Sequence, residues 1–189
     1  MSAESLLILG DRDSVLVLID IQERLTAAMP KGVRERVIEQ LSILLTVSEV
    51  LSIPVIVTEQ YPKGLGPTEL ALKSLLAETT PFIEKTSFSC ARADGFMEAV
   101  SQLGRKQIIL TGMETHICVV QTALDLQQQG YQVFVVEDAV SSRSKANQYN
   151  ALQRMRQAGI IVTTVESILF EWIGDAKHPD FKTLAQLII

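Results

Sequence analysis

Apolar runs rich in β-branched residues alternate with amphipathic stretches along the whole chain. Six runs carry a strand pattern: 14-SVLVLID-20, 53-IPVIVTE-59, 80-TPFIEK-85, 107-QIILTGM-113, 132-QVFVVED-138 and 160-IIVTTV-165. Most of them are almost continuously apolar, which is typical of strands buried on both faces of a parallel sheet. The run at 80–85 is the weakest, because it is short and ends in two charged residues.

The stretches between these runs carry helical periodicity. Helices are predicted at about 33–51, 68–77, 94–104, 115–129, 144–158 and 166–174, with a further helical tail from about 179. Glycines stand at 104, 130 and 159, and glycine is the usual residue just past a helix end. Strands that alternate with helices predict right-handed crossovers and a parallel sheet covered on both faces. With no repeat or linker, residues 1–189 are expected to form a single domain.

Composition narrows the class of protein. Of the 189 residues 47% are hydrophobic, the net charge is -5, and aromatic residues make up only 5%. Lys and Arg are scattered singly, so neither a basic stripe nor a base-stacking surface predicts nucleic-acid binding. No apolar run reaches the roughly 18 residues of a membrane span. Two cysteines without a CxxC motif, and an N-terminus unlike a signal peptide, favour a reducing, cytoplasmic location.

Three chemically useful side chains come at or just after predicted strands. Asp20 ends the first strand, Lys85 ends the third, and Cys118 follows the fourth. Ligands of parallel α/β sheets bind beyond the carboxyl ends of the strands, where the strand order reverses. The three residues are therefore expected to share one edge of the sheet.

An acid, a base and a thiol at one edge suggest nucleophilic catalysis. A thiolate is the working nucleophile, and its pKa of about 8.5 falls near Lys or at a helix N-terminus. If Thr115 caps the following helix, Cys118 takes the third helical position, where backbone N–H groups favour negative charge. Asp20 would take up the thiol proton and return it later. Lys85 would hold the thiolate by charge.

Each residue taken alone also has an ordinary explanation. Cys118 could be a small core residue, Asp20 a turn residue and Lys85 a solvated surface cation. Cys90 lies in a predicted loop with no evident base beside it, and His116 would face away from the thiol on a helix. Two distant histidines make a His-based metal site unexpected. Only the convergence of three strand ends favours catalysis.

Five segments together resemble one known family. They are 17-VLIDIQERL-25, 57-VTEQYPKGLGPT-68, 82-FIEKTSFSC-90, 112-GMETHICVVQTALDL-126 and 136-VEDAVSSRS-144. In this order the chain resembles the isochorismatase-like (cysteine hydrolase) superfamily, and most of all its short isochorismatase-domain-containing proteins of unassigned substrate. The resemblance spans about residues 14–182. It implies a three-layer α/β/α sandwich with a six-stranded, mainly parallel sheet.

The resemblance also implies roles for single residues. It implies a catalytic triad of Asp20, Lys85 and Cys118, and a cis peptide bond between Met113 and Glu114. It further implies an oxyanion hole made by the backbone N–H groups of Glu114 and Cys118. Metal-dependent nicotinamidases of the superfamily carry histidines after the second strand. Here residues 59–61 read Glu-Gln-Tyr, so no metal and no cofactor are expected.

The sequence thus predicts a hydrolase that cleaves a C–N bond of a small amide through a Cys118 thioester. Gln22, Tyr61 and Phe88 are hypothetical pocket residues, because they lie in loops after strands. A thiol-based redox sensor, and a catalytically silent assembly protein on the same fold, remain alternatives. A homo-oligomer is expected, partly because the superfamily commonly forms them. The apolar segment 181-FKTLAQLII-189 either contacts a partner or packs on its own sheet layer.

Overall fold

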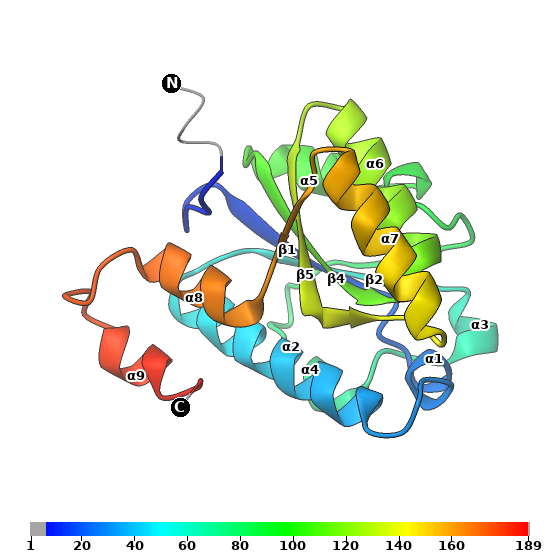
Figure 1. Ribbon diagram of the computed structural model, residues 1–189, viewed down its shortest axis with the longest axis horizontal. Coiled ribbons are helices and arrows are strands. Elements are labelled where there is room, and N and C mark those ends of the chain that lie inside the picture. Colours follow the sequence, from blue (N-terminus) through cyan, green and yellow to red (C-terminus); the bar gives the residue numbers. More distant parts are fainter. Residues whose placement is uncertain (1–6, 189) are drawn as a thin grey trace.

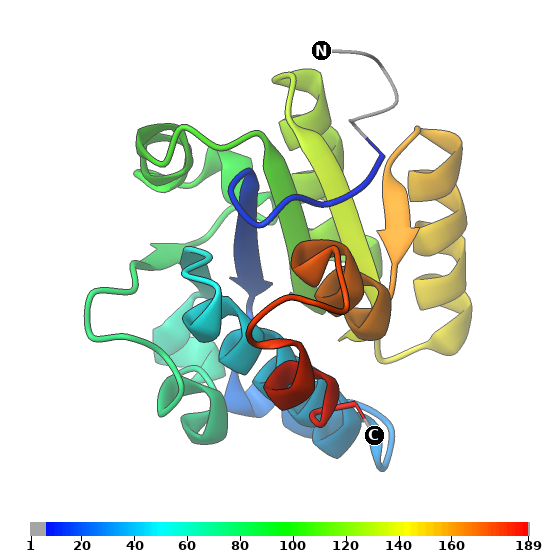
Figure 2. The same cartoon turned by 90° about the vertical axis from the view of Figure 1, so that its left-hand side faces the viewer.

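The computed structural model describes residues 7–188 and contains one six-stranded sheet. Its strands are β1 (Ser14–Ile19), β2 (Val55–Gln60), β3 (Phe82–Lys85), β4 (Gln107–Met113), β5 (Gln132–Ser141) and β6 (Ile161–Thr163). The strand order is β3-β2-β1-β4-β5-β6, and every pairing is parallel. The arrows of β1 and β6 accordingly point the same way in Figure 2. The order reverses between β1 and β4, so the predicted reversal point lies at the carboxyl ends of these strands.

Helices cover both faces of the sheet (Figure 1). They are α1 (Glu23–Ala27), α2 (Val33–Val50), α3 (Pro62–Leu65), α4 (Leu70–Lys73), α5 (Phe96–Gln102), α6 (Val120–Gln128), α7 (Lys145–Gln157), α8 (Val165–Ile173) and α9 (Phe181–Ala185). One buried core cluster joins the sheet to α2, α8 and α9, and the other joins it to α5, α6 and α7. The three-layer prediction is confirmed. In the described part of the chain, no helix is long and apolar enough to cross a membrane.

The predicted elements are all present, with local differences. Helices α1 and α3 were not predicted, because their five and four residues are too short to show a period and α3 contains the Pro and Gly typical of a loop. The equally short α4 was predicted from Thr68 and Glu69, which can start a helix. Strand β5 continues to Ser141, three residues beyond its apolar run. At the C-terminus Leu184 is fully buried, and Leu187 and Ile188 pack against the same core. The apolar tail therefore packs on its own protein, which is the second of the two alternatives.

Gly112 allows β4 to approach β1 closely at the order reversal. Its φ is +134°, and a Cβ at this position would lie 2.2 Å from the carbonyl oxygen of Ile19. Ile19 is its Cα partner across the ladder, and the register between β4 and β5 shifts just before it. Only glycine fits without a backbone shift. The residue after Ile19 and the turn after Gly112 are thereby brought together.

Candidate active site

Asp20, Lys85 and Cys118 meet at the carboxyl edge of the sheet, as the sequence predicts. The Lys85 Nζ atom donates to Asp20 Oδ2 at 2.7 Å and lies 3.8 Å from Cys118 Sγ. The side chains of Asp20 and Lys85 are 0% exposed, and Cys118 is 6% exposed. Lys85 is therefore not a solvated surface cation, and Asp20 is not an exposed turn residue. The three side chains, which come from different strand ends, thus form one buried cluster.

Strand β2 lies between β1, which Asp20 directly follows, and β3, which ends at Lys85. It contributes two polar side chains to the cluster. Thr58 Oγ1 donates to Asp20 Oδ1 at 2.8 Å, and Gln60 Oε1 accepts from Lys85 Nζ at 2.6 Å. Neither residue was predicted from the sequence. Thr58 and Gln60 are two residues apart at the end of a buried strand, so their side chains lie on the same face of the sheet. This spacing is the sequence signal that could have identified them.

The carbonyl oxygens of Ser87 and Phe88 complete the surroundings of the ammonium, each at 3.3 Å from Lys85 Nζ. With Asp20 and Gln60 they give the buried cation four oxygen partners. A buried charge is tolerated when it is paired and hydrogen-bonded in this way. Lys85 is consequently held in one place.

Unusual backbone geometry gathers at the same edge. Asp20, Tyr61 and Glu114 directly follow β1, β2 and β4, and their φ angles are 55°, 37° and 55°. Residues other than glycine adopt positive φ at a cost of about 1–3 kcal/mol, and such residues cluster at functional sites. The only other described non-glycine residue with positive φ is Ser52, which lies in the turn before β2. Three strained strand ends thus surround the Asp20–Lys85–Cys118 cluster.

Cys118 lies in a π-helical turn, Thr115–Val119 (η3), that leads into α6. Single π turns inside helices are frequent at functional sites. The predicted Thr115 cap is wrong: Glu114 precedes the first turn, no side chain caps it, and the buried Thr115 hydroxyl has no hydrogen-bond partner. Cys118 is therefore one position further into the turn than predicted. Its N–H already donates to the Glu114 carbonyl oxygen at 3.1 Å, so it is not a free donor.

The predicted cis peptide between Met113 and Glu114 is absent, since no peptide bond in the described residues is cis. The chain instead reverses at Glu114, whose φ of 55° and ψ of 62° are left-handed. A left-handed residue costs less than a non-proline cis bond, which costs about 3–4 kcal/mol. The turn that carries Cys118 is thus reached by a different backbone geometry.

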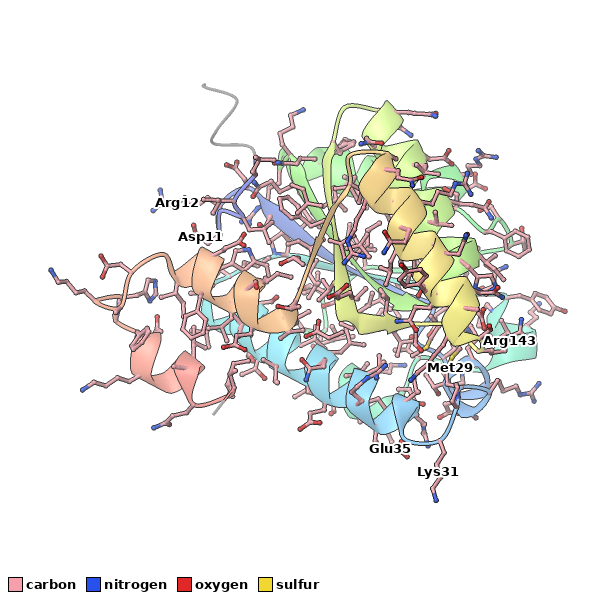
Figure 3. The ribbon with its side chains drawn as sticks, viewed as in Figure 1. Asp11, Arg12, Met29, Lys31, Glu35 and Arg143 are labelled. Atoms are coloured by element: carbon pink, nitrogen blue, oxygen red, sulfur yellow. The ribbon has the colours of Figure 1, made fainter. Side chains whose placement is uncertain are left out.

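The side chain of Glu114 anchors this turn. Its carboxylate is almost buried, accepts from Arg143 Nε at 2.8 Å and lies 3.3 Å from His116 Nδ1. His116 Nδ1 is also 3.0 Å from Ser142 Oγ. The imidazole therefore contacts Glu114 and Ser142, and not Cys118. Arg143 is 61% exposed and extends at the end of the molecule where Met29 also lies (Figure 3). The predicted role of Glu114 concerned its backbone only, and these side-chain contacts were not predicted.

Burial governs the proton affinities of the cluster. It raises the pKa of Asp20, although the nearby Lys85 charge opposes the effect. Burial also lowers the pKa of Lys85, but the negative groups around it, Asp20 first, outweigh burial and raise that pKa overall. Lys85 therefore stays an ammonium ion. A carboxyl with a raised pKa suits a group that accepts a proton and later returns it.

The pKa of Cys118 is raised, whereas the sequence predicted that it would be lowered. Burial is the main cause and the charge of Asp20 the second, and Lys85 opposes both. Cys118 is thus a protonated thiol in the free protein. The sequence could not show this because burial depends on the packed structure.

Cys90 lies beside the same cluster, which the sequence did not reveal. It begins a 3₁₀ turn, Cys90–Arg92 (η2), and is fully buried. Its Sγ is 3.6 Å from Thr58 Oγ1, and its N–H donates to Thr122 Oγ1 at 2.9 Å. Burial, and then the charge of Asp20, raise the pKa of Cys90 to about 11. The charges of Asp20 and Lys85 therefore affect the pKa of both cysteines.

The three hypothetical pocket residues have different environments. Gln22 is fully buried, and its amide exchanges hydrogen bonds with the Gln60 backbone and donates to the Gly66 carbonyl at 2.7 Å. It holds the loop after β2 and does not present its side chain to a ligand. Tyr61 is 56% exposed and, with Lys85, lines a cavity of about 370 Å³. Phe88 has an exposed ring and gives its carbonyl to Lys85.

Residues 7–188 contain no group of three or more His, Cys, Asp or Glu side chains that could hold a metal ion. At the end of β2, where metal-dependent nicotinamidases carry histidines, Gln60 places a neutral amide beside Lys85. The site is built from one carboxyl, one ammonium, one amide, one hydroxyl and two thiols. These groups can transfer protons and form a covalent bond to carbon.

The model of the isochorismatase domain family matches residues 14–167. The chain belongs to the isochorismatase family. Isochorismatase domain-containing protein 2 of Xenopus laevis is 42% identical over 181 residues, which cover 96% of this chain and 86% of that protein. The resemblance found in the sequence is therefore confirmed.

Solved structures agree with the family and the fold. A protein of Caenorhabditis elegans described as MAR1 ribonuclease is 40% identical, with a TM-score of 0.89 and coverage of 96% of this chain and 92% of that chain. The YcaC gene product of Escherichia coli, described as an octameric hydrolase of unknown specificity, is 27% identical. Its TM-score is also 0.89, and the match covers 96% of this chain and 89% of the other. The fold of this chain is thus the isochorismatase-like α/β fold.

Proposed function

We propose that this isochorismatase-family protein is a metal-independent cysteine hydrolase that cleaves the C–N bond of a small amide. The observation that carries the proposal is the position of the Lys85 ammonium, 2.7 Å from Asp20 Oδ2 and 3.8 Å from Cys118 Sγ. A buried acid, a fixed cation and a thiol at one strand edge form the minimum set for acyl transfer to sulfur.

The first step is attack by sulfur. Asp20 removes the proton from Cys118, and the sulfur adds to the carbonyl carbon of the amide. Negative charge moves from the thiolate to the carbonyl oxygen, and the tetrahedral intermediate forms. Lys85 stabilises the thiolate as it appears, because it is fully buried and little water screens its charge.

The second step splits the amide. Asp20 returns its proton to the leaving nitrogen, the C–N bond breaks, and the amine departs from a Cys118 thioester. Water then attacks the thioester carbon while Asp20 takes one of its protons. The C–S bond breaks, the sulfur recovers a proton from Asp20, and the acid is released. One water is consumed for each amide cleaved.

The backbone N–H groups of Glu114 and Cys118 are the proposed oxyanion donors. In the free protein, the Cys118 N–H donates a hydrogen bond to the Glu114 carbonyl oxygen. Binding of the oxyanion would therefore have to share or replace that bond. Two such donors stabilise a developing alkoxide strongly in a site that excludes water.

The proposed setting follows from the chemistry and the relatives. Both cysteines are free thiols, and chains without disulfides are typical of a reducing compartment, which favours the cytoplasm. The octameric YcaC protein supports a homo-oligomer for this chain. The substrate is proposed to be a small molecule, and no cofactor is required by the steps above.

RNA is a second substrate to consider, because the C. elegans relative is described as a ribonuclease. Phosphodiester cleavage needs cations that contact the phosphate. The ammonium of Lys85 is already enclosed by four oxygens, and the chain carries a net charge of -5. The site therefore favours a neutral amide over RNA.

The test is a screen of small amides, ureides, enol ethers and a short RNA with purified protein, followed by intact-mass analysis of the trapped enzyme. Turnover of an amide with an acyl adduct on Cys118 supports the proposal. Peroxide-driven sulfenate formation without turnover would instead identify a thiol sensor. Labelling of Cys90 with an inert Cys118 would overturn the assignment of the nucleophile.

A further inference from the structure

Thr58 holds Asp20 from two sides. Its backbone carbonyl oxygen accepts the N–H of Asp20 at 3.1 Å, and its hydroxyl donates to Asp20 Oδ1 at 2.8 Å. Thr58 and Asp20 are both fully buried. Asp20 has a strained positive φ, and these contacts come from the neighbouring strand β2. Thr58 therefore fixes both the backbone and the carboxylate of the residue.

The direction of the hydrogen bonds follows from the number of protons. A hydroxyl has one hydrogen to donate and two lone pairs that accept. Thr58 gives its hydrogen to the carboxylate, which as an anion can only accept. The 3.6 Å contact between Thr58 Oγ1 and Cys90 Sγ must then run from the thiol to the hydroxyl. With a pKa of about 11, Cys90 keeps the proton that this bond needs.

The two carboxylate oxygens consequently have separate partners. Oδ1 is bound by Thr58 and Oδ2 by Lys85, so rotation of the carboxylate would break both bonds. Besides Lys85, Cys118 acts on the pKa of Asp20, and the charge of Asp20 acts on the pKa of Cys90. The carboxylate is thus held in one orientation near both thiols.

We propose that Thr58 is a positioning residue for Asp20, and that the Cys90 thiol sets the direction of the Thr58 hydroxyl. The inference rests on the proposed role of Asp20 as the base for Cys118. It gives Cys90 a function as a buried hydrogen-bond donor to the site. The chain of donors runs from Cys90 to Thr58 and from Thr58 to Asp20.

The test is the pH dependence of Cys118 alkylation by iodoacetamide, followed by intact mass in the full-length protein. The ionised Asp20 accepts the thiol proton, so the rate falls on the acid side as Asp20 becomes protonated. Thr58→Val keeps the shape of the side chain but removes the bond that stabilises the carboxylate. The midpoint of the acid limb should move up by about one pH unit.

Thr58→Ser keeps the hydroxyl and should restore the midpoint of the wild type. Thr111→Val is the matched control, because Thr111 is also fully buried and donates its hydroxyl to a carbonyl of β1, that of Val17, at 3.0 Å. A merely structural threonine would slow alkylation at every pH without moving the limb. The inference fails if Thr58→Val keeps the wild-type midpoint, or if Thr111→Val moves it equally.

Cys90→Ala supplies a second measurement if Thr58→Val does not fold. Cys90→Ala should raise the midpoint of the acid limb by less than Thr58→Val does. The Thr58 hydroxyl remains in this variant but no longer accepts a hydrogen bond from the Cys90 thiol. An unchanged midpoint in Cys90→Ala overturns the role assigned to Cys90. Alkylation needs no substrate, so a shifted limb without amide turnover would leave this inference standing and reject the proposed function.

Discussion

Two short helical segments each bring a cysteine to the same acid and ammonium. In η3, Cys118 lies 3.8 Å from Lys85 Nζ and keeps 6% exposure. In η2, Cys90 is 0% exposed and contacts Thr58, not the charged pair itself. The pKa of both thiols is raised mainly by burial. Burial makes neither thiol acidic, so access and direct contact with Lys85 are what favour Cys118 over Cys90.

The proposed nucleophile, Cys118, thus differs from Cys90 in its contact with Lys85 and in its exposure. Thr122 connects the segments, since its hydroxyl accepts the N–H of Cys90 at 2.9 Å and donates to the Cys118 carbonyl at 2.7 Å. The same side chain thus spaces the two cysteines. Four predictions test this division of roles, in order of decreasing effect.

The largest effect is expected from removal of the proposed nucleophile. Cys118→Ala should lower turnover of a hydrolysed amide by at least about 10³-fold, because no other group can form the thioester. Cys90→Ala should lower it by less than about tenfold, since a thiol-to-hydroxyl bond contributes less. Steady-state kinetics on both variants give the ratio. Equal losses would erase the distinction between the segments.

The second effect concerns stability. Lys85→Met leaves the Asp20 carboxylate buried without its cation and should cost about 3–5 kcal/mol of unfolding free energy. Urea denaturation measures the loss, and the double variant with Asp20→Asn should recover part of it. Arg92→Met on the η2 side is the control, because its partner Asp125 pairs with it at an exposed position. The control should change the denaturation midpoint far less.

The third effect appears at alkaline pH. The pKa of Cys90 is raised from 9.0 to about 11, so the folded state holds this proton more tightly than the unfolded chain. The stabilisation is full below the unfolded pKa and is lost as pH rises through the folded one. Between about pH 9 and pH 11 the wild type should lose about 2 kcal/mol more than Cys90→Ala.

Denaturation at several alkaline pH values measures this difference. The Cys118 thiol, whose pKa is also raised, remains in Cys90→Ala, so the pH dependence from that residue should persist in both proteins and cancel in the comparison. Parallel stability curves for the two proteins would contradict the buried, protonated state assigned to Cys90.

The smallest effect tests the link between the segments. Thr122→Val leaves the buried N–H of Cys90 without its acceptor, which should cost about 1–2 kcal/mol. Thr122→Ser keeps the hydroxyl and should recover most of the loss. The denaturation midpoint measures stability, and the rate of Cys90 labelling should rise as η2 loosens. If Thr122→Val is as stable as Thr122→Ser, the hydrogen bonds of the Thr122 hydroxyl do not stabilise the protein.

The alternation of apolar runs and amphipathic stretches was sufficient to predict the six strands, the main helices and the layered architecture. Each such segment carries its own period, so the pattern survives without tertiary contacts. The strand-end rule then placed Asp20, Lys85 and Cys118 on one edge. Short elements such as α3 escaped, because four residues do not make a period.

The sequence by itself therefore determined the architecture, the family and the three residues that meet at the sheet edge. Only the tertiary structure decided their surroundings: the Thr58 and Gln60 contacts, the second thiol of Cys90 and the left-handed turn at Glu114. It also reversed the expected direction of the Cys118 pKa. The physical reason is that periodicity is local in the chain, whereas burial and hydrogen bonding join residues distant in sequence. Lys85 and Asp20, for example, are separated by 65 positions.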